Sequence, residues 1–252
     1  MSKLIEILTD PLAIILYMYA GLWLWETLAP AKTLPKMRFW KLRGIAFFIF
    51  NFFLASVIPL LTDTYLARFQ LVDFSHVNRV LAAFVGVLIY QGLLYFWHRA
   101  LHTNNFLWKS FHQMHHSTER LDIPSAFYTG PLDTFGFTLL GSISFVLLLG
   151  LSPEAATLAV LFLTFLSLFQ HSNIRTPLWL GYIIQRPEAH SMHHGRGVHR
   201  YNYSDFSFYD MLFKTFKNPR KHQEETGFYD GASERILDML VMKDVSEPAK
   251  SK

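Results

Sequence analysis

Long runs of apolar residues alternate with short polar stretches through most of the first 170 residues. A helix that crosses a bilayer needs about 20 mainly apolar residues, and five runs approach this length. The last two are separated only by Gly-Leu-Ser-Pro, which is typical of a tight turn between antiparallel helices. The pattern therefore predicts an all-α, polytopic membrane protein with four to five transmembrane helices. The runs are 11–29, 44–62, 80–97, 134–153 and 155–170.

Positive charge is distributed unevenly among the predicted loops. Residues 31–43 include five lysines and arginines and no acid, whereas residues 63–77 have one arginine against two aspartates. Because cytoplasmic loops carry an excess of lysine and arginine, we expect the first of these loops on the cytoplasmic side. Following the chain through the later spans puts 98–132 and 171–252 on that side too. Both segments are rich in histidine, so we expect one cytoplasmic, histidine-rich helical cap.

The composition narrows the possible chemistry. Of the 252 residues, 51% are hydrophobic and only 17% are charged, so much of the surface is expected to face lipid. The chain has no cysteine, which excludes disulfides, cysteine-ligated iron–sulfur clusters, thiolate haem and a thiol nucleophile. A net charge of +4 can attract nucleic acid, but here it fits positively charged membrane loops better, and we expect no nucleic-acid partner.

Histidine is abundant and clustered. Nine of the twelve histidines lie between residues 98 and 194. Within the clusters the spacing is mostly three or four residues, which places imidazoles on one face of a helix. The order is His-x3-His, His-x2-His-His, a single histidine, and a second His-x2-His-His. These residues are His98 and His102; His112, His115 and His116; His171; and His190, His193 and His194.

This pattern predicts a metal centre. Imidazole is a good ligand for iron, zinc and copper, whereas an all-histidine shell disfavours magnesium and calcium. Nine convergent imidazoles exceed the needs of one ion, and nitrogen-rich ligation without a redox-active protein group fits two irons that activate O2. A lone histidine pair at a helix end is more often a polar terminus, so the prediction depends on the clusters lying together. We expect His76 and His222 to be solvated. His199, close to the third box, could lie beside the ligands or at the substrate mouth, and a position without a role in the site is the alternative.

The histidine boxes resemble those of the fatty acid hydroxylase/sterol desaturase superfamily, whose members carry them in this order around a membrane-embedded di-iron site. The resemblance covers about 80–220 and includes Gln-His-Ser-Asn around His171, Pro187 and Glu188 before the third box, and the segment 202–216. Carried over by position, it implies that the iron ligands are His98, His102, His112, His115, His116, His190, His193 and His194, with His171 as a ninth.

Three residues depart from the family pattern. Ser204 and Lys214 stand where the family has glycine, and Tyr209 stands where it has tryptophan. All three lie outside the boxes, so they leave the predicted ligands intact and put the substrate subgroup in question. Asp210 could orient a ligand histidine through its second ring nitrogen, as carboxylates outside a ligand shell often do. An exposed helix-cap aspartate is the alternative.

The resemblance implies O2-dependent hydroxylation or desaturation of a lipid such as a sterol, a fatty acyl chain or an ether lipid. We expect an external electron donor of the ferredoxin, rubredoxin or cytochrome b5 type with its reductase, because no haem, flavin or cysteine-ligated domain fits in the remaining length. The basic residues of 214–221 could dock an acidic donor, and ordinary positive-inside bias is the other explanation.

The chain is predicted to have three parts. Residues 1–79 form N-terminal transmembrane helices and the basic loop, 80–220 a catalytic domain, and 221–252 a polar cytoplasmic tail. With no fused cytochrome b5 domain and no clear retrieval signal, a bacterial cytoplasmic membrane is favoured over the endoplasmic reticulum.

Two alternatives to an oxygenase make different demands on the histidines. A haem-based electron carrier would need histidines facing each other inside the bilayer. A non-catalytic metal-binding protein of the same fold would be favoured by a missing box histidine, and none is missing.

Overall fold

The computed structural model describes residues 8–248, and the regular structure in this range is helical, with two isolated bridges and no strand. Five segments are long and apolar enough to cross a membrane, which confirms the prediction of an all-α, polytopic chain. They are Pro11–Leu28 (helix α2), Trp40–Phe69 (α3, Trp40–Leu66, and a 3-10 turn), Arg79–Thr103 (α4), Pro131–Leu148 (α7, Pro131–Ser142, and a π-helical end) and Pro153–His171 (α8).

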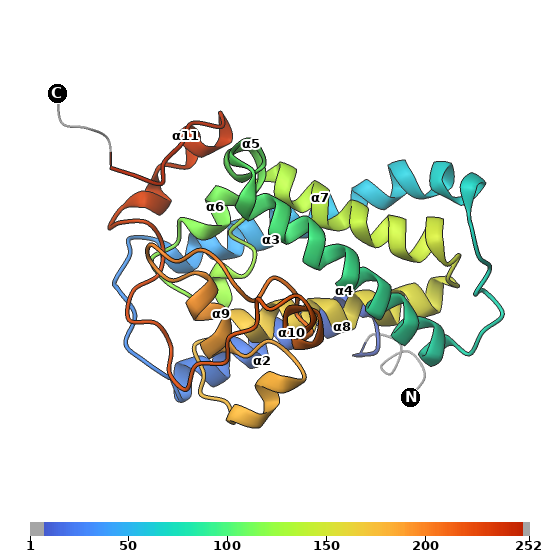
Figure 1. Cartoon of the computed structure of the whole chain (residues 1–252), viewed down its shortest axis with the longest axis horizontal. Helices are drawn as coiled ribbons and strands as arrows, with labels where there is room; N and C mark the ends of the chain where they lie inside the picture. Colours follow the sequence, from blue (N-terminus) through green and yellow to red (C-terminus); the bar gives the residue numbers. More distant parts are fainter. Residues whose placement is uncertain (1–7, 249–252) are drawn as a thin grey trace.

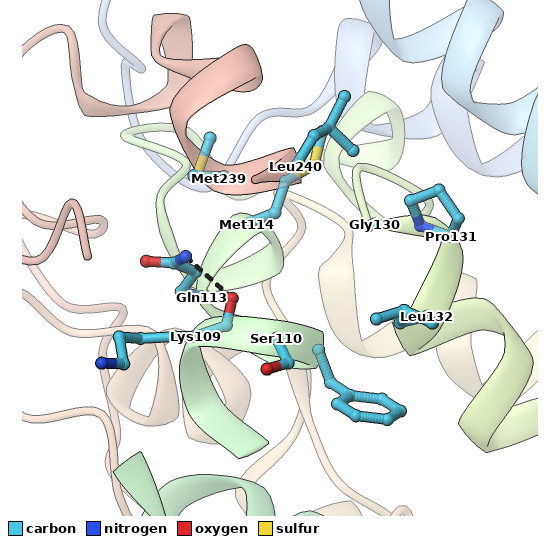
Figure 2. A pocket seen from close by; sticks show the side chains of 10 residues that line it. Lys109, Ser110, Gln113, Met114, Gly130, Pro131, Leu132, Met239 and Leu240 are labelled. Carbon is cyan, nitrogen blue, oxygen red and sulfur yellow. Dashed lines mark hydrogen bonds between the residues drawn. The ribbon is translucent and has the colours of Figure 1, made fainter. Parts of the chain in front are cut away.

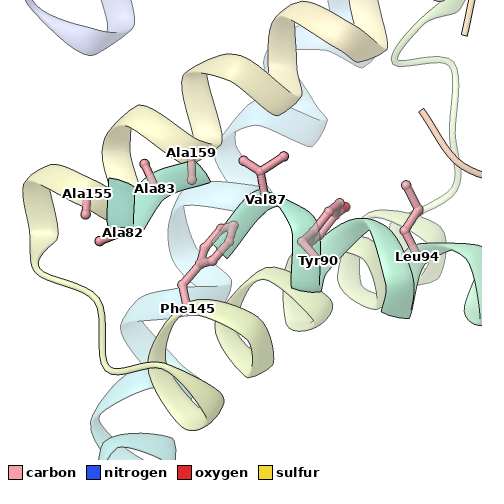
Figure 3. Close-up of a cluster of buried hydrophobic side chains, with 8 residues drawn as sticks. All are labelled: Ala82, Ala83, Val87, Tyr90, Leu94, Phe145, Ala155 and Ala159. Atoms are coloured by element: carbon pink, nitrogen blue, oxygen red, sulfur yellow. The ribbon is translucent and has the colours of Figure 1, made fainter. Parts of the chain in front are cut away.

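The five long helices pack as an elongated bundle, in which α3 contacts α7, and α8 contacts both α2 and α4 (Figure 1). Small side chains line the contact between α4 and α8: Ala82 and Ala83 lie near Ala155 and Ala159 (Figure 3). Because alanine ends at Cβ, the two backbones can approach closely, as is common between helices in membranes. Phe145 closes this cluster from the segment after α7.

The turn predicted between the last two spans is present. Gly150 has a φ of +52°, a left-handed conformation that glycine adopts without steric cost. Ser152 then caps α8, since its side chain accepts a hydrogen bond from the Ala155 amide, and Pro153 occupies the first helical position. These local signals produce a helical hairpin.

The opposite end of the bundle, at the left of Figure 1, is covered by short helices and irregular segments. The basic loop lies there too: the Ala31 amide donates to the Asn173 carbonyl (2.8 Å), and the Asn173 side chain donates to the Lys32 carbonyl (2.8 Å). The loop and the histidine-rich segments therefore share one end of the bundle, whereas its cytoplasmic orientation stays a prediction. The short helices at this end are α5 (Asn105–Leu107), α6 (Gln113–His116), α9 (Pro187–His193) and α11 (Ile236–Leu240), whereas α10 (Ser207–Leu212) lies against α4 nearer the middle of the bundle (Figure 1).

Glu26, the one acid within the first span, connects this span to the cap. Its buried carboxylate accepts hydrogen bonds from the amides of Ile123 (3.1 Å) and Asn173 (2.9 Å). Ile123 follows the second histidine box and Asn173 follows His171. The residue that interrupts the apolar pattern thus ties α2 to two segments of the cap.

The segment after residue 220 packs onto the second histidine box. Its buried side chains form a hydrophobic cluster with Trp40, Met114 and Tyr128. Gly227 has a φ of +80°, and a Cβ there would lie 2.9 Å from the Ser117 carbonyl oxygen, so only glycine fits. Residues 1–7 and 249–252, at the ends of the first and third predicted parts, lie outside the described range. From the segment after residue 220, the hydrophobic cluster around Trp40, Met114 and Tyr128 contains Phe228, Ala232, Met239 and Val245.

Candidate metal centre

The structure brings all nine predicted histidines into two adjacent groups. Within each group the candidate ligand nitrogens lie within 4.8 Å of one another. The groups touch, because the rings of His116 and His194 stack with their centroids 4.0 Å apart. The five-histidine group is His98, His102, His112, His116 and His193, and the four-histidine group is His115, His171, His190 and His194.

The long helices deliver histidines at their ends. His98 and His102 lie in the last turns of α4, one helical turn apart, and His171 is the last residue of α8. The other histidines come from the short helices of the cap and their flanking residues. The centre therefore sits where the apolar bundle meets the cap.

Each three-histidine box is divided between the two groups. In the second box His112 and His116, four residues apart, join the five-histidine group, while His115 joins the other. The third box reverses this division: His190 and His194 belong to the four-histidine group and His193 to the five. Residues at i and i+4 share a helix face, so each box gives a pair to one group and a single ligand to its neighbour.

Most of the histidines are held through Nδ1. In four of them Nδ1 lies within hydrogen-bond distance of an oxygen that can only accept, so Nδ1 carries the proton and Nε2 is left with its lone pair. Such a contact fixes the tautomer and the ring orientation of a metal-ligating histidine. The pairs are His98 with the Tyr203 carbonyl (2.8 Å), His171 with the Ser167 carbonyl (2.6 Å), His190 with Gln185 Oε1 (2.5 Å) and His193 with the Tyr201 carbonyl (2.7 Å).

His112 is held by a carboxylate that the sequence reasoning missed. Its Nδ1 lies 3.0 and 3.1 Å from the two oxygens of Asp133, which is fully buried at the start of α7. The available signal was an acid beside an apolar run, since ionisable residues at such positions are usually functional. The predicted span began at residue 134 and so excluded it.

The spacing of the Nε2 atoms fits metal ions. Two imidazole nitrogens bound at about 2.1 Å and at right angles on one ion lie about 3.0 Å apart. The corresponding distances are 2.9 Å for His98 and His112 and 3.0 Å for His171 and His190. The pair His115 and His171 is separated by 3.1 Å.

Several buried ring nitrogens have no hydrogen-bond partner within residues 8–248. These include Nε2 of His116 and His193, and both nitrogens of His102 and of His194. An unpaired buried polar atom is costly, so such atoms usually indicate a site for an ion, water or ligand. All-nitrogen donors at this spacing fit iron or another transition metal.

Burial keeps the imidazoles of the cap neutral. The pKa of His116 lies well below its usual value because the ring is buried, and the neighbouring His194 and His102 lower it further. Burial also lowers the pKa of His194, with His190 as the next cause. A neutral imidazole has the free lone pair that a metal ion requires.

Asp210 acts differently from either sequence-based expectation. It is buried, so it is no exposed cap, and its carboxylate accepts from backbone amides and from the Thr215 hydroxyl (2.6 Å) rather than from a histidine. It accepts hydrogen bonds from the amides of Tyr203 (2.8 Å) and Ser204 (2.9 Å). Since the Tyr203 carbonyl accepts from His98, Asp210 orients this histidine through the turn that it stabilises.

The start of α9 is fixed by a buried ion pair. Arg186 and Glu188 approach to 3.0 Å, and both side chains are almost inaccessible. Glu188 also accepts from the amide (2.9 Å) and hydroxyl (2.7 Å) of Thr176. These contacts set the position of the third histidine box, two residues further on.

The three remaining histidines lie outside both groups. His199 lies beside the site, with its Nδ1 3.1 Å from Nδ1 of His116, and His76 is exposed as expected. The expectation that His222 is solvated is wrong: it is half-buried, and burial lowers its pKa to about 4 despite the nearby Glu188. The reason is that the chain is held here, since the Gln223 amide donates to the Ser191 hydroxyl (2.9 Å).

Comparison with known proteins gives a consistent result. The family model described as Fatty acid hydroxylase matches residues 83–215. A very-long-chain aldehyde decarbonylase of Oryza sativa subsp. indica is 33% identical over 147 residues, covering 52% of this chain and 52% of the relative. Sphinganine C4-monooxygenase 1 of Arabidopsis thaliana is 30% identical over 148 residues, with 54% of each chain covered.

A sphingolipid C4-hydroxylase of Saccharomyces cerevisiae is 29% identical over 155 residues, covering 58% of this chain and 43% of the relative. The chain thus spans about half the length of the curated relatives it matches. No solved structure matches it.

Proposed function

The chain belongs to the fatty acid hydroxylase family, and from this premise we propose that it is an integral-membrane oxygenase in which the nine histidines hold two iron ions. It uses O2 and two externally supplied electrons to hydroxylate a long-chain lipid. The observation that carries the proposal is the pair of histidine groups with unpartnered buried nitrogens at one end of an apolar bundle. Bound iron supplies the O2 activation needed to attack an unactivated C–H bond.

The surrounding residues orient the ligands. Asp133 and Gln185 hold His112 and His190 through Nδ1, so that Nε2 faces the metal position. In the cap, burial keeps the histidines neutral and also excludes bulk water from the reaction.

We propose that the substrate is a lipid that reaches the centre from the bilayer. Helices α4 and α8 are long and apolar enough to cross a bilayer, and each carries candidate ligand histidines in its last turns. This arrangement favours a substrate whose apolar chain lies alongside these helices. The names of the relatives make sphingoid bases the first class to test. A long-chain aldehyde is the second candidate, favoured by the relative with 33% identity, and desaturation remains the alternative outcome at the same centre.

The electrons come from an acidic protein donor that docks near His193. The carbonyl of Tyr201 accepts from His193 Nδ1, and the Tyr201 ring is flanked by Arg200 at 5.1 Å and Lys217 at 5.2 Å. Both cations are exposed, and neither forms an ion pair within the described residues. Together with the basic loop, they favour a cytoplasmic location for this end. The bacterial membrane stays a prediction.

The test combines metal analysis with isotope labelling. Protein purified in detergent is analysed for iron, then supplied with a sphingoid base, a chemical or protein reductant and ¹⁸O2. We expect close to two irons per chain and ¹⁸O in a hydroxylated product. His115→Ala should lower the iron content and abolish O2 consumption, whereas the matched variant His76→Ala, at an exposed position, should do neither.

Each other outcome identifies a different function. A double bond without ¹⁸O in the lipid would indicate a desaturase, and a product one carbon shorter than an aldehyde substrate would indicate a decarbonylase. A chain that binds no iron after anaerobic reconstitution would refute the proposal, as would equal effects of the two substitutions.

A further inference from the structure

The nine-histidine cluster is closed on all but one edge. Eight of its histidines are buried, and His102 alone is partly exposed. His102 lines a cavity of about 310 Å³ together with Trp108 and His199. The remaining lining residues are Thr103, Asn104, Asn105 and Ser246, of which the first three are exposed. The cavity therefore opens at the protein surface and ends against His102, the one member of the five-histidine group that lines it.

The lining of this cavity suits a small cation rather than a lipid. It contains hydroxyl, amide and imidazole groups, one tryptophan, and no lysine or arginine that would repel a cation. Behind this lining, both ring nitrogens of His102 are buried and have no hydrogen-bond partner within the described residues. His199, which belongs to neither histidine group, lies beside them with its Nδ1 3.1 Å from Nδ1 of His116.

We propose that this cavity is the port through which ferrous iron reaches the centre, with His199 as a transient ligand that passes the ion to His102. The inference rests on the proposed iron-binding function. Iron bound in a protein is exchanged only if the ligands can be reached, and a plausible site includes a path to it. The other eight histidines are buried and His102 is the one of the nine that is partly exposed, so we expect an ion from water to reach the centre past this side chain, whose ring nitrogens lie inward.

A second cavity provides the matched control. It has a volume of about 90 Å³ and lies nearby, between the second histidine box, the start of α7 and α11 (Figure 2). Lys109, Met114 and Leu240 are among its lining residues, and no histidine is. Filling it should add the same bulk to the cap without obstructing the path to the metal ligands.

The experiment measures metal uptake rather than turnover. Metal-free protein in detergent is mixed anaerobically with Fe²⁺, or with Co²⁺ as a spectroscopic probe of nitrogen ligation, and bound metal is followed over time. Asn105 is the residue to enlarge, because it is exposed at the rim and no side-chain hydrogen bond is assigned to it. Asn105→Trp should slow uptake by about tenfold or more and leave the final metal content unchanged. Asn105→Ala and Leu240→Trp should load like the natural protein.

A role for His199 predicts a separate effect. His199→Ala should also slow uptake, with the full metal content reached at long times, because the residue contacts the incoming ion but lies outside both groups. Equal uptake rates in Asn105→Trp and the natural protein would overturn the port, as would an equal slowing by Leu240→Trp. If the natural protein binds no metal, the proposed function itself fails, which is a distinct result.

Discussion

Asp133 offers the sharpest test of how the centre is built. Its carboxylate is fully buried and lies 3.0 Å from Nδ1 of His112, in the five-histidine group. Asp133→Leu removes the acceptor while keeping an apolar side chain of similar size. Loss of such an outer partner typically weakens metal binding about 10- to 100-fold. That corresponds to about 1.4–2.7 kcal/mol of binding free energy.

The effect should be confined to one of the two metals. Asp133 contacts no histidine of the four-histidine group, so Asp133→Leu should retain one ion and bind the other weakly. Asp133→Asn keeps an oxygen that accepts from Nδ1 and should have a smaller effect. Competition with a chelator of known affinity, followed by iron analysis and spectroscopy, measures both affinities.

A matched substitution separates metal binding from general stability. Asp122 is also a buried carboxylate of the cap, but it binds Trp40 Nε1 (3.0 Å) and Arg120 (2.7 Å) and no histidine. Asp122→Asn should lower the melting temperature and leave both metal affinities unchanged. The reasoning is refuted if Asp133→Leu keeps two tightly bound metals, or if Asp122→Asn loses metal to the same extent.

Three further predictions concern residues outside the ligand set. Lys214 has a φ of +61° and is exposed, so Lys214→Gly should raise the free energy of unfolding by about 1 kcal/mol, measured in a denaturant or thermal melt. Glu26→Ala leaves two buried amides unpaired and should lower the free energy of unfolding by about 1–3 kcal/mol. Glu26→Gln keeps an acceptor and should lower it less, so an equal loss in the two variants would contradict this account. Tyr209 donates to the Leu88 carbonyl (2.6 Å) and forms no hydrogen bond with a box histidine. Tyr209→Trp should therefore leave the metal content, measured by elemental analysis, unchanged while altering substrate preference. Loss of metal would instead assign Tyr209 a role in supporting the ligands.

The bundle was predictable because its causes are local. A bilayer requires about 20 apolar residues per crossing, and all five predicted runs correspond to long helices. The turn at Gly150 and Ser152 was likewise readable, since backbone conformation and capping depend on neighbouring residues. Helix α4 nevertheless extends beyond its apolar run: it continues to Thr103, so that both His98 and His102 lie within the helix.

The surroundings of the site were less predictable because they join distant parts of the chain. His98 is held by a carbonyl 105 residues away, and His112 by a carboxylate 21 residues away. No spacing rule reveals such pairs. His222 was misjudged for the same reason, since its basic neighbourhood suggested solvent, while the fold holds this segment against α9.

The sequence by itself determined which histidines come together, because i, i+4 spacing on a helix and the length of an apolar span are properties of adjacent residues. It also determined that the basic loop and the histidine boxes share one end of the bundle. Only the tertiary structure decided how the nine histidines divide into groups of five and four, with each three-histidine box shared between them. That division depends on how α4, α6, α8 and α9 pack, and the direction of each ring depends on acceptors that the fold brings from elsewhere in the chain.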